Sequence, residues 1–197
     1  MSRGHHETEI KLPMSNANAG RRMLRAAGFL VVKRRVFEAN TVFDTPRQTL
    51  AKSSRLLRIR QAGSVRTLTY KGAPTPSKHK SREERELTVS DAGTMAVIVE
   101  RLGFRPMFRY EKYRTEYQQP GRQGVAMLDE TPIGVYLELE GTPAWIDRTA
   151  RLLSFTEEAY ITQSYGALYR SWCRGNHIKP SNMVFAERGT SGSPGHA

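Results

Sequence analysis

The sequence is poor in cysteine and has no long apolar run. Its single cysteine, Cys173, excludes an intramolecular disulfide and a cysteine-rich zinc site. No apolar stretch approaches the length of a membrane span, and the polar N-terminus lacks the apolar segment of a signal peptide. These absences predict a protein of the cytoplasm. We expect the Cys173 thiol to be inert, because no partner motif lies near it in the sequence.

Negative charge is also scarce, since 31 lysines and arginines face 19 acidic residues and leave a net charge of +12. This surplus favours an anionic partner, such as nucleic acid, anionic lipid or a polyphosphate compound. The length of 197 residues fits one sizeable domain. We expect that domain to span residues 1–175 and a flexible tail to span 176–197, because the final stretch "ERGTSGSPGHA" has too little apolar content to fold.

Alternating polarity predicts many strands, and apolar stripes predict helices. Ser15 and Ser90 are candidate N-caps of two helices that end at Gly28 and Gly103. This repeated spacing indicates a weak internal duplication, and common helix punctuation is an equally fair explanation. Two further helices are expected over 145–154 and 157–174. The expected strands are 6–12, 32–44, 55–62, 65–72, 81–89, 107–118, 124–130 and 134–141.

Charged residues stand at every second position of these strands. The opening stretch "ETEIK" places Glu7, Glu9 and Lys11 on one strand face, and "LLRIRQ" does the same for Arg58 and Arg60. The alternation recurs in later strands, where one face carries Lys71, then Arg82, Glu84 and Glu86, then Lys112 and Arg114, and finally Glu138 and Glu140. A single face of this kind is typical of a solvated antiparallel sheet.

The opposite faces argue for a different arrangement of the whole set. They hold apolar residues such as Ile10, Leu12, Leu137 and Leu139, which must pack against something. A closed barrel with helices outside and charged side chains inside accounts for both faces. Buried charges are tolerated only if they pair, or if they hold metal ions and a polyanion. The prediction is therefore an α+β protein with an antiparallel β-barrel and helices packed outside.

The Glu-x-Glu-x-Lys opening resembles that of the CYTH superfamily, the triphosphate tunnel metalloenzymes. The resemblance covers roughly residues 5–170. It continues, in the family's order, in "NTVFDTPRQTLAKSSRLLRIR", "LTYKG", "SREERE", "EKYRTEY", "VAMLDETPIGVYLELEG" and "YITQSYGALY". It implies an eight-stranded antiparallel barrel that forms a tunnel for a triphosphate and a divalent metal ion, Mg²⁺ or Mn²⁺.

The same resemblance assigns metal ligands at both ends of the chain. Glu7 and Glu9 match the N-terminal ligands, and Glu138 and Glu140 match the C-terminal ones. Hard oxygen donors suit Mg²⁺ and Mn²⁺, and a cation relieves the repulsion among carboxylates that meet across a barrel. Asp129 is a further candidate, either as a ligand or as an outer-shell acceptor.

Basic residues match the family's phosphate-binding positions. Arginine forks suit paired phosphate oxygens, and lysines supply compact charges. The positions are Lys11, Arg58, Arg60, Lys71, Arg82, Lys112 and Arg114. For Arg82, a salt bridge to a neighbouring glutamate is an equally good account. Within this set the resemblance gives catalytic roles to Lys11, Lys71 and Glu9, and Glu84 and Glu86 are expected to orient the basic residues.

Other conspicuous residues are given structural roles. Asp44-Thr45-Pro46 predicts a turn after a strand. His5 and His6 would point to opposite faces of a strand, so we expect surface residues rather than a chelating pair. Trp145, Trp172 and the tyrosines of the last helix are expected to pack in the core or between helices.

Hydrolysis of a triphosphate is the leading functional hypothesis, with inorganic triphosphate, thiamine triphosphate and nucleoside triphosphates as substrates implied by the resemblance. The alternative is a class IV adenylate cyclase, which converts ATP to cyclic AMP and pyrophosphate. The histidine-phenylalanine pair that precedes the opening motif of characterised cyclases is replaced here by His5-His6, which favours hydrolysis. No residue is assigned to a base, so inorganic triphosphate is expected to be turned over at least as well as ATP.

A third hypothesis is a non-catalytic module that binds RNA or polyphosphate. The glutamates that share faces with the basic residues argue against nucleic acid as the partner, because nucleic-acid binders mix basic patches with exposed aromatic residues. The expected partner is thus a small molecule that contains a triphosphate. The sequence leaves the oligomeric state open, a homodimer included.

Overall fold

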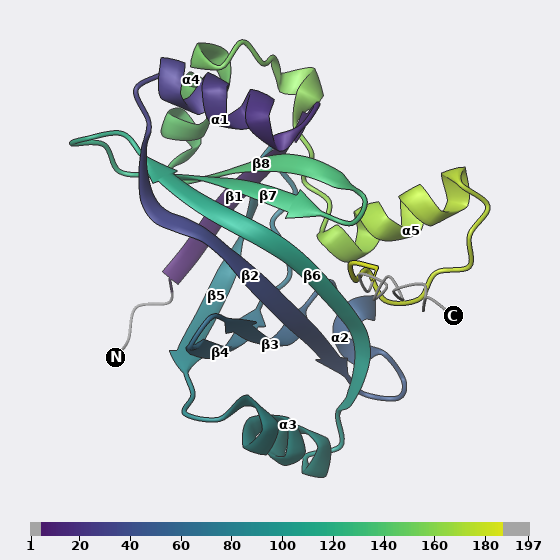
Figure 1. Cartoon of the computed structure of the whole chain (residues 1–197). Coiled ribbons are helices and arrows are strands. Elements are labelled where there is room, and N and C mark those ends of the chain that lie inside the picture. Colours follow the sequence, from purple (N-terminus) through teal and green to yellow (C-terminus); the bar gives the residue numbers. More distant parts are fainter. Residues whose placement is uncertain (1–4, 187–197) are drawn as a thin grey trace, which may run out of the picture.

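The computed structural model describes residues 5–186. Eight antiparallel strands close into a barrel in the order β1-β5-β4-β3-β2-β6-β7-β8 (Figure 1). The strands are β1 (His5–Met14), β2 (Leu30–Asp44), β3 (Leu56–Ala62), β4 (Val65–Lys71), β5 (Lys80–Thr88), β6 (Arg105–Gln118), β7 (Val125–Thr131) and β8 (Gly134–Glu140). Each predicted strand is present within two residues at either end, and the predicted barrel is confirmed.

The helices lie outside the barrel, as predicted (Figure 1). They are α1 (Ala17–Ala26), α2 (Thr49–Lys52), α3 (Ala92–Arg101), α4 (Pro143–Leu152) and α5 (Tyr165–Gly175), with a short 3₁₀ helix over Glu157–Ala159 between the last two. Within the described residues, no helix combines the length and apolar character needed to cross a membrane.

Two predicted N-caps are wrong by one position. Asn16 accepts a hydrogen bond from the Ala19 N–H at 2.9 Å, and Asp91 accepts one from Thr94 at 2.6 Å. Ser15 and Ser90 directly precede these caps, whose Asn and Asp side chains rank with serine as capping groups. Since the adjacent residues are all good caps, the sequence pattern could not choose between them. The predicted ends are confirmed, because Gly28 and Gly103 have φ of +78° and +93°.

The predicted helix over 157–174 is also wrong, because it is interrupted. Ile161 pairs with Lys11 through two backbone hydrogen bonds of 2.8 and 2.9 Å. These bonds satisfy backbone groups of β1 beyond its pairing with β5, which ends at Glu9 and Lys80. Buried backbone groups require such partners, so tertiary pairing overrides the apolar stripe and α5 begins only after Ser164.

Asp44 has the structural role that the turn prediction gave it. Its carboxylate accepts hydrogen bonds from the backbone N–H groups of Thr45, Leu50 and Ala51 at 2.7–2.9 Å. These bonds hold the short helix α2, which was not predicted because four residues carry no periodic signal. The end of β2 and the loop that follows it are thereby fastened together.

The main apolar core lies between the outer face of the barrel and the helices. Ile10, Leu12, Leu137 and Leu139 are fully buried and pack in one cluster with residues of α1 and α4, Trp145 among them. A second cluster joins β6 to α5 and contains the buried Cys173. The outward apolar faces predicted from alternation are confirmed, and packing there leaves the inner faces to the charged residues.

Part of the predicted tail lies against the barrel. Met183 pairs with β6 through hydrogen bonds to the backbone of Arg109 and Glu111, at 3.0 and 2.9 Å, and its side chain is buried. Residues 187–197 lie outside the described residues. The division into a domain and a tail stays a prediction, and we call residues 176–186 the strap.

Gly124 tests the packing between the β6–β7 loop and α4. Its φ is +128°, and an added Cβ would lie 2.4 Å from the indole of Trp145. We expect Gly124→Ala to lower the free energy of unfolding by about 2–3 kcal/mol through overpacking and backbone strain. Gly121 in the same loop also has a positive φ but open space around it, so Gly121→Ala should cost about 1 kcal/mol. Equal losses in denaturant unfolding would contradict the packing assignment.

Candidate active site

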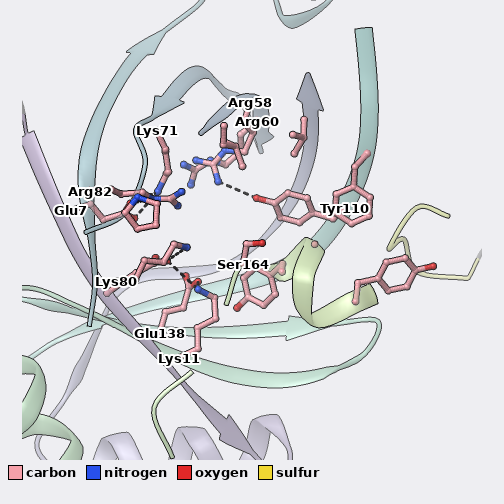
Figure 2. A pocket seen from close by; sticks show the side chains of 18 of the residues that line it. Glu7, Lys11, Arg58, Arg60, Lys71, Lys80, Arg82, Tyr110, Glu138 and Ser164 are labelled. Atoms are coloured by element: carbon pink, nitrogen blue, oxygen red, sulfur yellow. Dashed lines mark hydrogen bonds and ion pairs between the residues drawn. The ribbon is translucent and has the colours of Figure 1, made fainter. Parts of the chain in front are cut away.

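The inner faces of the strands enclose a cavity of about 1200 Å³. Its walls contain every predicted metal-binding and phosphate-binding residue except Asp129. Register explains the convergence, because Glu9 of β1 pairs with Glu140 of β8 on one side and with Lys80 of β5 on the other. Figure 2 shows Glu7, Lys71 and Arg82 gathered on one side of the cavity.

Glu9 and Glu138 are held in their charged forms by basic neighbours. Glu9 lies 2.8 Å from the Lys80 ammonium and 3.2 Å from that of Lys11, which is in turn 2.9 Å from Glu138. Burial alone would raise the pKa of Glu9, but Lys11 and Lys80 outweigh it and hold that pKa well below its usual range. Burial is likewise outweighed at Glu138, where Lys11 and Arg114 lower the pKa.

Glu7 and Glu140 are in the opposite situation. Burial raises the pKa of Glu140 to about 7, and repulsion from Glu7 adds to the shift. Burial and the neighbouring Glu9 also raise the pKa of Glu7, although Lys71 lies 2.6 Å from it. The carboxylate repulsion expected from the sequence thus raises the pKa of Glu7 and Glu140, while ion pairs stabilise the charged forms of Glu9 and Glu138.

The donor set fits a hard divalent cation. Glu7, Glu9, Glu138 and Glu140 offer carboxylate oxygens from two adjacent strands, and a cation would relieve the conflict that raises the pKa of Glu140. Over residues 5–186, no three acidic, histidine or cysteine side chains are already arranged to hold a metal ion. Lysines instead contact Glu7, Glu9 and Glu138, so a metal ion that binds these carboxylates would have to displace Lys71, Lys11 or Lys80 from them.

A second wall of the cavity is basic. The Arg58 guanidinium donates to the Tyr110 hydroxyl at 3.1 Å (Figure 2). It also donates to the Thr69 hydroxyl at 3.2 Å. The predicted orienting role of Glu86 agrees with its contacts, since it lies 3.0 Å from Arg60 and accepts from Thr69 at 2.7 Å. Arg58 and Arg60 each contact several groups rather than one carboxylate in a two-pronged pair, so phosphate oxygens can replace these contacts.

Glu84 and Arg82 complete the side of the cavity formed by β5. Glu84 lies 3.2 Å from the Lys71 ammonium, which agrees with the orienting role predicted for it. Arg82 lies 3.6 Å from Glu7. Its Nε has no hydrogen-bond partner among the described residues, so phosphate binding and the salt bridge both remain consistent with its position.

Asp129 lies behind the basic wall rather than on the cavity surface. Its carboxylate accepts hydrogen bonds from Lys112 at 2.8 Å, from Arg114 at 2.6 and 2.7 Å, and from the Tyr165 hydroxyl at 2.6 Å. The Lys11 and Lys112 ammonium groups also lie 5.2 and 5.0 Å from the centre of the Tyr165 ring. These contacts favour an outer-shell role for Asp129, and Tyr165 does more than the packing expected of it.

Two interior residues were missed. Lys80 contacts Glu9, and it follows the same alternation as Arg82, but the predicted strand began one residue too late to include it. Glu38 is 1% exposed and lies 3.7 Å from both Arg60 and Lys112, without a hydrogen bond to either carboxylate oxygen. Burial raises the pKa of Glu38, but Lys112 and the surrounding arginines lower it to about 2. Glu38 stands two residues before the buried Asn40 on β2, so strand alternation could have identified Glu38 as an inward residue.

Of the two adjacent histidines, only His6 has a described side chain, and it does not join the site. His6 is exposed, as predicted for a surface residue. The side chain of His5 lies outside the described residues, so its predicted surface position stays a prediction.

Comparison with protein families now adds to this geometry. The model of the CYTH domain matches residues 5–163, which hold all the candidate metal and phosphate residues. The chain belongs to the CYTH family. The family resemblance identified from the sequence motifs is thereby confirmed.

Relatives of known sequence or structure agree with the family. A Methanocaldococcus jannaschii protein named as a candidate adenylate cyclase is 28% identical over 148 residues, which cover 75% of this chain and 83% of that protein. The structure of PH1819 from Pyrococcus horikoshii has a TM-score of 0.71 at 23% identity and covers 84% of this chain and 98% of that one. A Hippeastrum protein, described as a candidate adenylyl cyclase with dominant triphosphatase activity, has a TM-score of 0.62 at 21% identity, covering 84% and 95%. These structural likenesses establish the fold.

The raised pKa of Glu140 predicts a pH-dependent cost to folding. Its neutral form is favoured up to about pH 7 in the folded protein but only to about 4.5 in the unfolded chain. The contribution of Glu140 to the stability of the folded state is therefore complete below pH 4.5 and is lost as the pH rises through 7. In chelator, Glu140→Gln should therefore raise the free energy of unfolding by about 1–3 kcal/mol at pH 8 and by little at pH 4.5.

Denaturant unfolding at the two pH values measures this difference. Glu100→Gln, on the exposed side of α3, is the matched control and should change stability equally little at both. A Glu140→Gln effect that is independent of pH, or larger at pH 4.5, would contradict the assigned environment.

Proposed function

We propose that this protein is a divalent-metal-dependent enzyme that hydrolyses a triphosphate inside its barrel. The observation that carries the proposal is the closed barrel in which carboxylates of β1 and β8 face basic residues of β3 to β6. The proposed substrate is a small molecule with a triphosphate group, and the proposed metal is Mg²⁺ or Mn²⁺. The cytoplasmic location and a homodimeric state stay predictions.

Charge balance supports the requirement for a metal ion. Acidic and basic side chains around the cavity nearly balance, and most are already paired. A triphosphate would add several negative charges to this buried space, which is costly without compensation. A divalent cation entering with the substrate supplies that compensation and frees lysines from the carboxylates to contact phosphate.

The acidic residues and Lys11 have different proposed roles in the reaction. Glu7, Glu9, Glu138 and Glu140 would hold the metal ion, which when bound polarises phosphate oxygens and promotes ionisation of a water molecule. Burial would lower the pKa of Lys11, but Glu138 and Glu9 outweigh it and raise that pKa. Lys11 is therefore protonated in the free protein, and phosphate oxygens would replace the carboxylates as its acceptors, so Lys11 acts as a donor and not as a base.

Arg58, Arg60, Lys71, Arg82, Lys112 and Arg114 would hold the rest of the phosphate chain. Their charges stabilise the negative charge that develops on the transferred phosphoryl group and the leaving oxygen. Because the strands of a closed barrel hold these residues, the phosphate chain is oriented before reaction.

The comparisons support hydrolysis and keep cyclisation as the second candidate. The Hippeastrum protein shares the fold and is described by its dominant triphosphatase activity, although it too is named as a candidate cyclase. The Methanocaldococcus jannaschii relative is named only as a candidate adenylate cyclase. A non-catalytic RNA-binding module is disfavoured because the acidic residues line the same cavity as the basic ones.

Turnover should require a divalent cation and carboxylates from both β1 and β8. Glu9→Gln or Glu140→Gln should abolish cleavage in Mg²⁺ or Mn²⁺, and chelator should abolish it in the parent protein. Product chromatography should show phosphate release from a triphosphate and little cyclic AMP from ATP. Glu100→Gln on α3 is the control and should remain fully active. Full activity in chelator would overturn the metal assignment, and conversion of ATP mainly to cyclic AMP would replace hydrolysis by cyclisation.

The phosphate-binding assignment predicts selective loss of affinity. Arg58→Ala should weaken triphosphate binding by about 1.5–3 kcal/mol, the range for charge-assisted hydrogen bonds, and should affect a monophosphate far less. Lys112→Ala should act in the same direction. Arg101→Ala, exposed at the end of α3, serves as the control. Calorimetric affinities for inorganic triphosphate equal to those of the parent in both cavity variants would refute the assignment.

A further inference from the structure

A second hollow lies outside the barrel, where the end of α1, the loop between β6 and β7, and α4 meet. Its volume is about 420 Å³, within the roughly 300–1,000 Å³ of small-molecule sites. We call it the outer hollow and define it by lining residues Gly28, Gln119, Arg122, Trp145, Arg148 and Thr149. Figure 1 shows α1 and α4 together at the top, with the β6–β7 loop projecting beside them and α5 on another side of the barrel.

Contacts between its walls fix the shape of the outer hollow. The Gln119 side chain donates a hydrogen bond to the Ala27 carbonyl at 2.8 Å, which joins the β6–β7 loop to the end of α1. On the other side, Gly124 lies so close to the Trp145 ring that an added Cβ would be 2.4 Å from it. The loop is thus fastened to both helices, and the hollow exists before any ligand enters it.

The outer hollow contains hydrogen-bond donors that the protein leaves without acceptors. Arg122 and Arg148 are exposed, and neither forms a hydrogen bond or an ion pair with residues 5–186. Trp145 is 3% exposed, and its indole Nε1 is buried without a partner in that part of the chain. Thr149 is also 3% exposed, and its hydroxyl has no partner there either. Buried donors normally find acceptors, so this set indicates a ligand that supplies them.

The charge around the outer hollow favours an anion. Of the described residues that line it, none is acidic. Asp147 on α4 is engaged elsewhere, since it lies 3.0 Å from Lys78 and 2.7 Å from His79. The C-terminal ends of α1 and α4 carry partial negative charge, which opposes anion binding. Arg25 and Arg151, in the last turns of these two helices, offset that charge.

The number of donors distinguishes between kinds of anion. A phosphate group offers three or more acceptor oxygens and carries about two negative charges at neutral pH, whereas a carboxylate offers two oxygens and one charge. Two guanidinium groups, those of Arg122 and Arg148, match the charge of one phosphate and bind its oxygens in pairs. The Thr149 hydroxyl can then donate to a remaining oxygen. The volume of the hollow leaves room for free phosphate or for a small organic phosphate.

We propose that the outer hollow is a second ligand site, which binds a phosphate group outside the barrel. Arg122 and Arg148 bind the phosphate oxygens, and Thr149 donates a further hydrogen bond. The ligand is free phosphate or a small phosphate ester, because both present the same oxygens. The outer hollow shares no residue with the barrel cavity, so the proposal does not depend on triphosphate cleavage there.

The indole N–H signal of Trp145 in a ¹H–¹⁵N NMR spectrum reports on this site. The chain has two tryptophans, and the loss of one signal in Trp172→Phe identifies that of Trp145. The protein in chelator is titrated with orthophosphate, AMP, adenosine or acetate at constant ionic strength. We expect orthophosphate or AMP to shift the Trp145 signal to saturation, and adenosine and acetate to leave it in place. A shift with AMP alone would identify the ligand as an organic phosphate, and a shift with orthophosphate would show that free phosphate suffices.

Variants of the outer hollow locate the binding. The double variant Arg122→Ala, Arg148→Ala should raise the Kd from this titration about tenfold or more, because it removes two charge-assisted contacts. Both side chains are exposed, so the variant should fold. Thr149→Val should also weaken binding, and Thr149→Ser should restore it. Arg101→Ala, exposed on α3, is the matched control and should bind like the parent.

Arg58→Ala separates the outer hollow from the barrel cavity, because it removes a proposed phosphate contact in the barrel and should leave the Trp145 shift unchanged. A Trp145 signal that neither orthophosphate nor AMP moves would overturn the proposal. A shift that persists at the parent Kd in the double arginine variant, or one that Arg58→Ala abolishes, would also overturn it, since the phosphate would then be bound elsewhere.

Discussion

Compensation of buried charge is the constraint on which the rest of this structure depends. A barrel interior lined by carboxylates, ammonium groups and guanidinium groups is stable only if each charge has partners. Lys11 meets both Glu9 and Glu138, while Asp129 receives Lys112, Arg114 and the Tyr165 hydroxyl. The pairs Lys11–Glu138, Lys112–Asp129 and Arg114–Asp129 each join two strands, so the ion pairs and the closure of the barrel depend on each other.

The compensation is uneven, and the unevenness has functional meaning. Glu9 and Glu138 each have several positively charged neighbours, whereas Glu140 is half-buried near other carboxylates and its pKa rises to about 7. Among the described residues, Glu140 therefore lacks an ion pair, and the Nε atoms of Arg58, Arg60 and Arg82 on the basic wall lack a hydrogen-bond partner. A divalent cation and a polyanion entering together would satisfy both sides, which links the electrostatics of the free protein to the proposed reaction.

Apolar packing on the outside makes this interior possible. The outward residues of β1 and β8 are covered by α1 and α4, whereas α5 packs against Phe108 and Tyr110 of β6, which line the cavity. Because strand side chains alternate, burying one face against helices directs the other face into the barrel. The aromatic stack from Tyr110 through Phe108 to Tyr169 joins the two environments, since it starts at Arg58 in the charged interior and ends on α5.

Much of the fold follows from local pattern. Strict alternation predicted all eight strands and most of their inward charged residues, because the two-residue period of a strand is independent of its partners. The glycine ends of α1 and α3 were equally readable, since Gly28 and Gly103 occupy left-handed positions. The family motifs then assigned the metal and phosphate residues that the structure brings to one cavity.

Tertiary contacts decided what alternation could not. The apolar stripe after residue 157 has a helical pattern. The backbone of Ile161 nevertheless hydrogen-bonds to Lys11 at the edge of β1, so α5 begins only after Ser164. Lys80 and Glu38 matter because of their contacts with residues on other strands. Such contacts also cause the difference in pKa between Glu9 and Glu140. The cavity lining unites residues beside α2, in β6 and in the strap, which are distant in the chain. Periodicity is a property of one segment, whereas charge pairing and cavity shape arise only when separate segments meet in space.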